Sequence, residues 1–76
     1  MKWKGDKWNK ETITEDGYLL RIRFINKLNS YWWATFFEGE IIAVSNSKKD
    51  LKLTLSAAQK AAQQRMIKHL RTKMAS

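Results

Sequence analysis

The spacing of hydrophobic residues changes once along this chain, near Thr54. Before that point apolar and polar side chains alternate, most clearly from Tyr18 to Asn26, and a period of two is typical of a β-strand with one buried face. After it, apolar residues recur at three- and four-residue steps, as in one stripe of a helix. That stripe comprises Leu55, Ala58, Ala62, Met66, Leu70 and Met74. The sequence therefore predicts strands first and a single helix last.

Turn residues divide the first part of the chain into strands. The dipeptide Asp16-Gly17 and the lone Gly39 favour tight hairpin turns, and the most aromatic segment, 31–37, lies between them. We expect an α+β fold, with a three- to four-stranded antiparallel meander over residues 8–44 packed on one C-terminal helix over residues 54–73.

The helix is expected to begin at Thr54 or Ser56, because either side chain can accept a hydrogen bond from the first helical turn. The lysines and tryptophans of residues 1–10 alternate in a basic, aromatic arm or edge. With 76 residues and no cysteine, residues 1–76 are expected to form a single domain that is stabilised by packing alone.

Loop lengths predict which side chains share a face of the sheet. A three-residue loop at 27–29 pairs Asn26 with Ser30, and a two-residue turn at Glu38-Gly39 pairs Phe36 with Ile41. The helix-facing core is then Leu20, Ile22, Phe24, Trp32, Ala34, Phe36, Ile41 and Ala43. The opposite face is Arg21, Arg23, Tyr31, Trp33, Thr35, Phe37, Ile42 and Val44.

This second face is open to two interpretations. A contiguous exposed surface of arginine and aromatic side chains is typical of an interaction site. Alternatively, the N-terminal arm folds over it, so that Trp3 and Trp8 complete a second small core.

Charge is distributed unevenly along the chain. Its 15 Lys and Arg residues and 7 Asp and Glu residues give a net charge of +8, and every carboxylate lies in the first fifty positions. The charged residues within 51–76 are all basic. This suits either a solvated helix with favourable cations near its C-terminus or a phosphate-binding stripe. A membrane-surface helix is disfavoured, since the apolar stripe is made of alanine and methionine rather than bulky residues.

An acidic partner follows from this charge: nucleic acid or an acidic protein surface. The candidate nucleic-acid contacts are Arg21, Arg23, Tyr31, Trp33, Thr35, Lys27, Lys48 and Lys49. The candidate phosphate contacts are Lys2, Lys4, Lys60, Lys68 and Arg71. A sheet with such side chains can enter a major groove, and exposed aromatic rings can equally stack on unpaired bases.

The strand Tyr31-Trp32-Trp33-Ala34-Thr35-Phe36, the Glu38-Gly39 turn and the helix entry from Thr54 to Ala62 resemble parts of small βββα DNA-binding domains. These are the AP2-type domains and the N-terminal arm-binding domains of integrases, and the pattern is also similar to that of short phage or prophage proteins. The resemblance covers residues 12–70 in topology. It implies that Arg21, Arg23, Trp33 and Thr35 face a groove, and that the protein acts in a bacterial cell or a phage-infected host.

The sequence contains no set of residues from which we expect catalysis. His69 is the only histidine and has no neighbouring carboxylate, so neither a metal site nor a nucleophile with its base can be assembled. Glu38 and Glu40 flank a turn, where they increase solubility. No cofactor is expected.

Two functional hypotheses follow. The first is a non-catalytic nucleic-acid-binding module, with double-stranded DNA as its partner. The second is a phage-type interaction or inhibitor module that binds an acidic protein or forms a homodimer through the aromatic sheet face. The apolar runs are too short to span a bilayer and no leader is evident, so a soluble cytoplasmic protein is expected.

Overall fold

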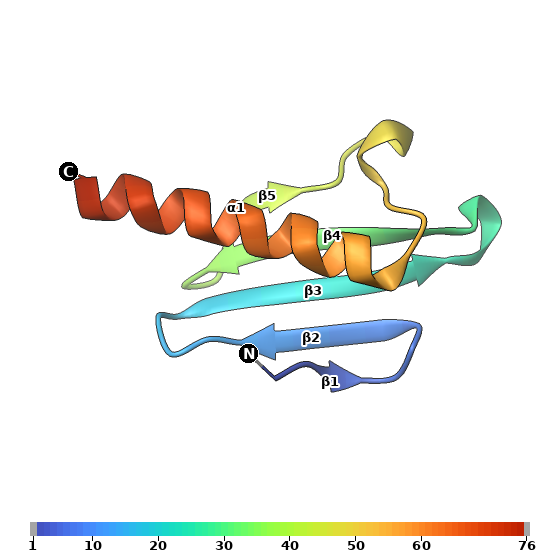
Figure 1. The fold of residues 1–76 in the computed structure, drawn as a ribbon, viewed down its shortest axis with the longest axis horizontal. Coiled ribbons are helices and arrows are strands. Elements are labelled where there is room, and N and C mark those ends of the chain that lie inside the picture. Colours follow the sequence, from blue (N-terminus) through green and yellow to red (C-terminus); the bar gives the residue numbers. More distant parts are fainter. Residues whose placement is uncertain (1, 76) are drawn as a thin grey trace.

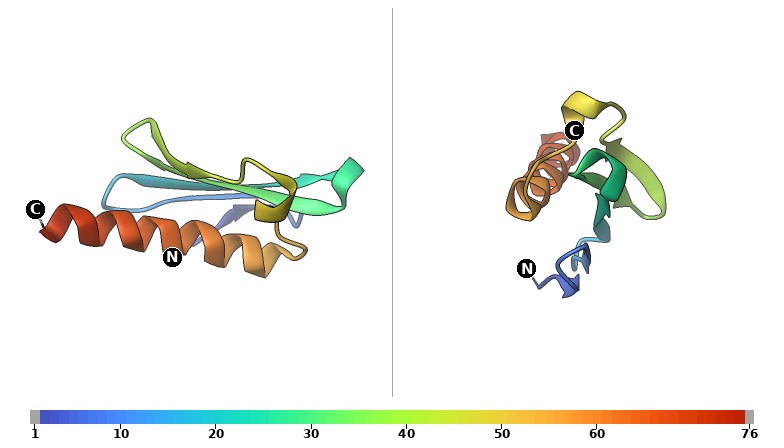
Figure 2. Two further views of the ribbon diagram at one scale, coloured as in Figure 1. Left: turned by 90° about the horizontal axis from the view of Figure 1, so that it is seen from above. Right: turned by 90° about the vertical axis from the view of Figure 1, so that its right-hand side faces the viewer.

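The computed structural model of the protein describes residues 2–75, so Met1 and Ser76 of the predicted domain lie outside it. Five antiparallel strands follow one another across a single sheet, and one helix packs on one of its faces (Figures 1 and 2). The elements are β1 (Lys4–Gly5), β2 (Asn9–Ile13), β3 (Tyr18–Ile25), η1 (Asn26–Leu28), β4 (Ser30–Phe37), β5 (Glu40–Val44), η2 (Lys48–Asp50) and α1 (Leu55–Ala75). The predicted α+β meander is confirmed, with a fifth strand added by the N-terminal residues.

The N-terminal segment forms the edge of the sheet. A side chain at Gly5 would collide with the carbonyl oxygen of Asn9, and the Gly5 φ of +118° suits glycine alone. Asp6 Oδ1 accepts hydrogen bonds from the backbone N–H groups of Trp8 and Asn9, at 2.8 and 2.9 Å, which closes the β1–β2 hairpin. Trp3 packs against the core beneath α1. The alternative in which the arm covers the opposite face is therefore wrong.

The loop between β3 and β4 has four residues rather than the predicted three. Residues 26–28 form a single 3₁₀ turn, and Asn29 adopts a left-handed conformation with φ of 48° while its N–H bonds to the Asn26 carbonyl. Ser30 consequently pairs with Ile25 instead of Asn26. This one-residue shift turns every side chain of β4 to the other face of the sheet.

The β4–β5 turn has the predicted two residues, and Phe36 pairs with Ile41. A β-bulge between Thr35 and Phe36 then shifts the register by one residue, so that Thr35 pairs with Ala43. The bulge keeps Ala43 on the helix side of the sheet, as predicted, even though its neighbours on β4 are reversed.

The observed core differs accordingly from the predicted one. Buried apolar side chains from the sheet and the helix meet in one cluster, which comprises Tyr18, Leu20, Ile22, Trp33, Ala58 and Ala62. Trp32, Ala34, Phe36 and Ile41, which were predicted to face the helix, lie on the opposite side. Trp33 takes their place, and its indole N–H donates to the Asp50 carbonyl at 2.9 Å, which fixes the loop before α1.

Helix α1 begins where predicted, because the Ala57 N–H donates to the Thr54 hydroxyl at 3.1 Å. Side-chain hydrogen bonds attach the helix to the sheet. The Thr35 hydroxyl donates to the Ala62 carbonyl at 2.9 Å, and the Tyr18 hydroxyl is bonded to His69 Nδ1 at 2.7 Å. The C-terminal end of the helix projects past the end of the sheet (Figure 1). Met74 of the predicted apolar stripe is therefore 78% exposed.

The two adjacent tryptophans of β4 test the register. Trp33→Ala removes a buried ring and should lower the free energy of unfolding by about 3–5 kcal/mol. Trp32→Ala removes a half-buried ring from the other face and should cost much less. Chemical denaturation of the two variants measures the difference, and a larger loss for Trp32→Ala would contradict this register.

Tyr18 gives the fold a pH dependence. Burial, followed by the charge of Asp16, raises the Tyr18 pKa above its ordinary value of 10.0. Because the folded state favours the neutral phenol, its contribution to stability is complete below pH 10.0 and is lost as the pH rises further. Tyr18→Phe should lower stability at neutral pH by about 1 kcal/mol, since the bond to His69 is lost. It should also make the decline above pH 10.0 shallower.

Urea unfolding at a series of pH values measures both effects. Tyr31→Phe is the matched control, because its hydroxyl lies at the surface and makes only a 3.4 Å contact with the Lys7 carbonyl. An equally steep alkaline decline in wild type and Tyr18→Phe would show that Tyr18 is not the group responsible.

Candidate nucleic-acid interface

The side of the sheet away from α1, which we call the open face, is covered by no element of the described chain. Strand register assigns to it Lys4 of β1, Asn9, Glu11 and Ile13 of β2, Leu19, Arg21, Arg23 and Ile25 of β3, Ser30, Trp32, Ala34 and Phe36 of β4, and Ile41 and Val44 of β5. Arginine and aromatic side chains thus share this surface, as the sequence predicted. The aromatic residues are different ones, however.

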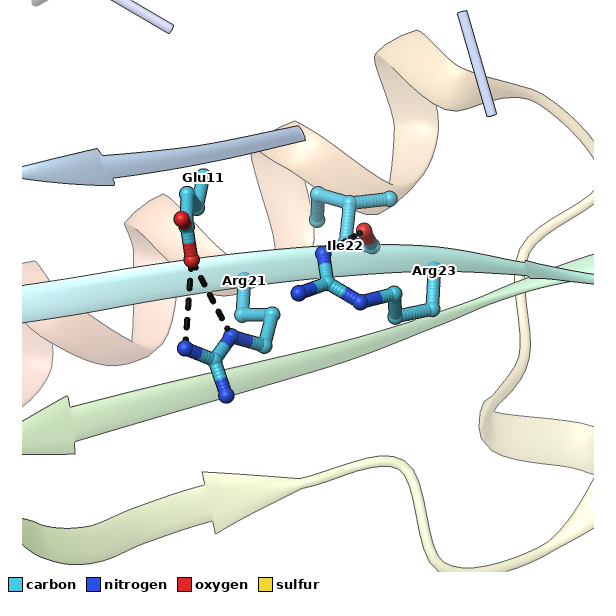
Figure 3. A network of polar contacts seen from close by, with 4 residues as sticks. All are labelled: Glu11, Arg21, Ile22 and Arg23. Atoms are coloured by element: carbon cyan, nitrogen blue, oxygen red, sulfur yellow. Dashed lines mark hydrogen bonds and ion pairs between the residues drawn. The ribbon is translucent and has the colours of Figure 1, made fainter. Parts of the chain in front are cut away.

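Arg21 and Arg23 lie on the open face, but both are held by neighbours. In Figure 3 the two side chains lie in front of β3, while α1 passes behind it. The Arg21 guanidinium binds the Glu11 carboxylate through Nη2 at 3.1 Å and Nε at 3.2 Å. Arg21 also lies 5.7 Å from the centre of the Phe36 ring. Arg23 Nη1 donates to the Ile22 carbonyl at 3.0 Å. The open face therefore presents one arginine that is paired with a carboxylate, Arg21, and one, Arg23, whose charge is kept because its acceptor is a neutral carbonyl.

Three predicted contact residues face the helix instead. Thr35 is fully buried and bonded to α1, and Trp33 is almost fully buried in the core. Tyr31 is half-buried, and its ring packs against Phe24 with centroids 5.0 Å apart. The four-residue β3–β4 loop is the cause, since it reverses the strand that carries all three. None of them is placed to contact a partner on the open face.

The solvent side of α1 forms a second basic surface. Its exposed cations are Lys60, Lys68 and Arg71, which we call the helix basic surface. Arg65 is also exposed, but it lies seven residues after Ala58 and therefore on the flank of the helix nearer the sheet. Ala58 and Ala62 pack against the sheet, and Lys60, two residues from each, points to the opposite side of a helix with 3.6 residues per turn. No aspartate or glutamate occurs anywhere in α1.

The last basic residue of the helix belongs to a different environment. Lys73 Nζ lies 3.8 Å from the centre of the Phe37 ring, in a cation–π contact at the end of the sheet. It therefore helps to attach the projecting end of the helix.

The remaining predicted lysines are exposed but scattered. Lys27 lies in the β3–β4 loop, and Lys48 and Lys49 lie in η2 on the path to α1. Lys4 pairs with Glu11 at the edge of the sheet, and Lys2 precedes β1. The predicted set is thus divided between two layers, so one flat surface cannot contact Arg21, Arg23 and the helix cations together.

Sequence reasoning missed Trp32 and Phe36 as open-face residues. Both belong to the aromatic strand that was singled out, and alternation alone permits either assignment. Only the left-handed Asn29 distinguishes them, and asparagine is among the few residues that adopt this conformation readily.

The described residues contain no cluster of histidine, cysteine, aspartate or glutamate suited to a metal ion. His69 is half-buried and hydrogen-bonded to Tyr18. A hollow of about 680 Å³ lies between the N-terminal segment, β2 and Met66, and its lining mixes Lys2 and Lys4 with Glu11, Glu15 and Asp16. Within residues 2–75, no helix is both long and apolar enough to cross a bilayer.

The chain was compared with models of protein families, with curated proteins and with solved structures, and none of the three comparisons produced a match. The resemblance to sheet-type DNA-binding domains therefore stays a prediction. What the two surfaces bind has to be argued from their own charge, exposure and geometry.

Proposed function

We propose that the protein is a non-catalytic nucleic-acid-binding module that contacts double-stranded DNA through the helix basic surface. The observation that carries this proposal is the absence of any carboxylate from α1, which bears five Lys and Arg residues along its length. A helix that only needs solubility normally mixes charges, because opposite charges four residues apart stabilise it. A helix of uniform positive charge is suited to a polyanion, where each cation displaces a counterion.

The helix is favoured over the open face on electrostatic grounds. Arg21 is bound to Glu11, and that carboxylate would approach the phosphates of any duplex on the sheet. The cations of the helix basic surface have no such neighbour on their own element. Phosphate binding therefore costs less desolvation and less repulsion at the helix than at the sheet.

The dimensions of the helix suit a major groove. Lys60 and Arg71 lie on one side of α1 and are separated by about 16 Å along its axis. A major groove is about 12 Å wide, so side chains at the two ends of this row can reach phosphates on both of its walls. Gln64 lies between them on the same side, and an amide at this position suits a base edge. Lys48 and Lys49, in the loop that leads into the helix, supply further phosphate contacts.

The salt dependence of DNA binding tests the proposal. Fluorescence anisotropy with a random-sequence duplex, between about 50 and 200 mM salt, gives the slope of the logarithm of affinity against the logarithm of salt concentration. The double variant Lys60→Gln/Arg71→Gln removes two phosphate contacts and should make this slope shallower by about 1.8. The matched variant Arg21→Gln/Arg23→Gln removes the same charge from the open face and should leave the slope nearly unchanged.

Each other result has a definite meaning. A larger effect of the Arg21 and Arg23 substitutions would transfer the interface to the sheet. Equal effects of the two variants would indicate attraction by net charge alone and would overturn the helix interface. Absence of binding to both duplex and single-stranded DNA at about 50 mM salt would overturn the function itself. Tighter binding of the single strand would replace the duplex as the partner.

A further inference from the structure

The open face ends in a row of apolar side chains that crosses four strands. Register pairs Ile13 with Leu19, Leu19 with Phe36, and Phe36 with Ile41, so the four side chains lie side by side. Its two ends are the most exposed, since Ile13 is 77% and Ile41 63% accessible. None of the four side chains of this apolar row belongs to the core cluster. An uncovered apolar row of this kind is typical of a protein contact surface.

The charges of the chain are separated on either side of the apolar row. On one side the β2–β3 and β4–β5 turns carry three exposed carboxylates, those of Glu15, Asp16 and Glu38. On the other side lie Arg21 and Arg23 of β3 and Lys4 of β1, with one carboxylate among them, that of Glu11, which binds Arg21. We call the two turns the acidic turns; Figure 1 shows both at the same end of the sheet.

We propose that the open face binds a second copy of this chain, with a two-fold axis along the apolar row. In that arrangement the row of one chain lies on the row of the other, and the strands of the two sheets run in opposite directions. The residues on one side of the apolar row then face the residues on the other side of the row in the second copy. Arg21 and Arg23 of each chain are thereby placed over the acidic turns of the other.

Self-complementarity is the reason for a second copy rather than an unrelated partner. An isologous interface requires each patch to meet its complement across the axis, and the order acidic, apolar, basic fulfils this condition. The order is also specific in orientation: an axis parallel to the strands would set Arg21 against Arg21 and Arg23 against Arg23. Two sheets packed face to face keep both α1 helices on the outside, so the helix basic surface stays accessible.

The expected contact is of modest size. A sheet of five strands spaced about 4.8 Å apart is roughly 20 Å wide, and the overlap from the acidic turns to Arg23 covers on the order of 500 Å² per chain. The total of about 1,000 Å² is near the lower limit for a specific interface. The dimer should therefore dissociate at low protein concentration and form at high micromolar concentration.

Sedimentation equilibrium without nucleic acid tests the dimer. The variant Ile13→Lys/Ile41→Lys changes two exposed side chains, so the monomer should remain folded, while the dimer Kd should rise at least about a hundredfold. Leu53→Lys is the matched control, because Leu53 is 80% exposed outside the open face and should leave the Kd unchanged. A wild-type chain that is monomeric at high micromolar concentration, or a dimer indifferent to Ile13→Lys/Ile41→Lys, would overturn the proposal.

Charge exchange tests the orientation of the two copies. Arg21→Glu/Arg23→Glu makes the face negative, and Glu15→Lys/Asp16→Lys makes the adjacent turn positive, so each variant alone should dimerise poorly. Mixed together, the two variants should form a heterodimer with a Kd near that of wild type, since both sets of contacts are then attractive. A mixture that stays monomeric would refute the proposed axis.

Two further measurements keep the charge-exchange result interpretable. Thermal unfolding shows that each variant is folded; if Arg21→Glu prevents folding through repulsion by Glu11, Arg23→Glu alone takes its place. Lys60→Gln/Arg71→Gln should leave the dimer Kd unchanged, because neither residue belongs to the open face. The dimer and the proposed DNA binding can therefore fail independently.

Discussion

The pairing register of β3 and β4 is the constraint on which the rest of the molecule depends. These two strands lie at the centre of the sheet and provide most of the surface on which α1 packs. Their register sends Trp33 and Thr35 towards the helix, where one fixes the loop before α1 and the other binds the Ala62 carbonyl. The same register sends Trp32 and Phe36 to the open face. A single loop residue thus decides both the composition of the core and the chemistry of the surface.

The sequence was sufficient for the order and type of the main elements, the strands β2 to β5 and the helix α1. The change of hydrophobic period near Thr54, the turns at Gly17 and Gly39 and the threonine cap all predicted features that the structure contains. Those signals are local, because each depends on residues within one turn or one strand. The faces of β4 could not be predicted in the same way. They depend on whether Asn26 belongs to the strand or to the loop, and its neighbours permit both.

The candidate site illustrates the same limit. Arg21 and Arg23 were predicted on the open face and lie there, because β3 alternates unambiguously. Tyr31 and Thr35 were predicted beside them and lie under the helix, because their position depends on the loop. The exposed helix cations were predictable from composition alone. Glu11 binds Arg21 and so weakens anion binding at the sheet. Predicting this ion pair would have required the register of β2 as well.

The projecting end of α1 has a consequence for the dynamics of the molecule. Lys68 and Arg71 are three residues apart, a spacing at which like charges repel. The C-terminal end of the helix also projects past the end of the sheet (Figure 1). Helical structure there depends on the turns that precede it and on the contact of Lys73 with Phe37, whereas the turns around Ala58 and Ala62 are buried against β3 and β4. Backbone amides of the last turn should therefore exchange with solvent through local fraying, and those of the buried turns only when the whole domain opens. The local stability of the helix is therefore highest where it packs on the sheet and lowest at its free end.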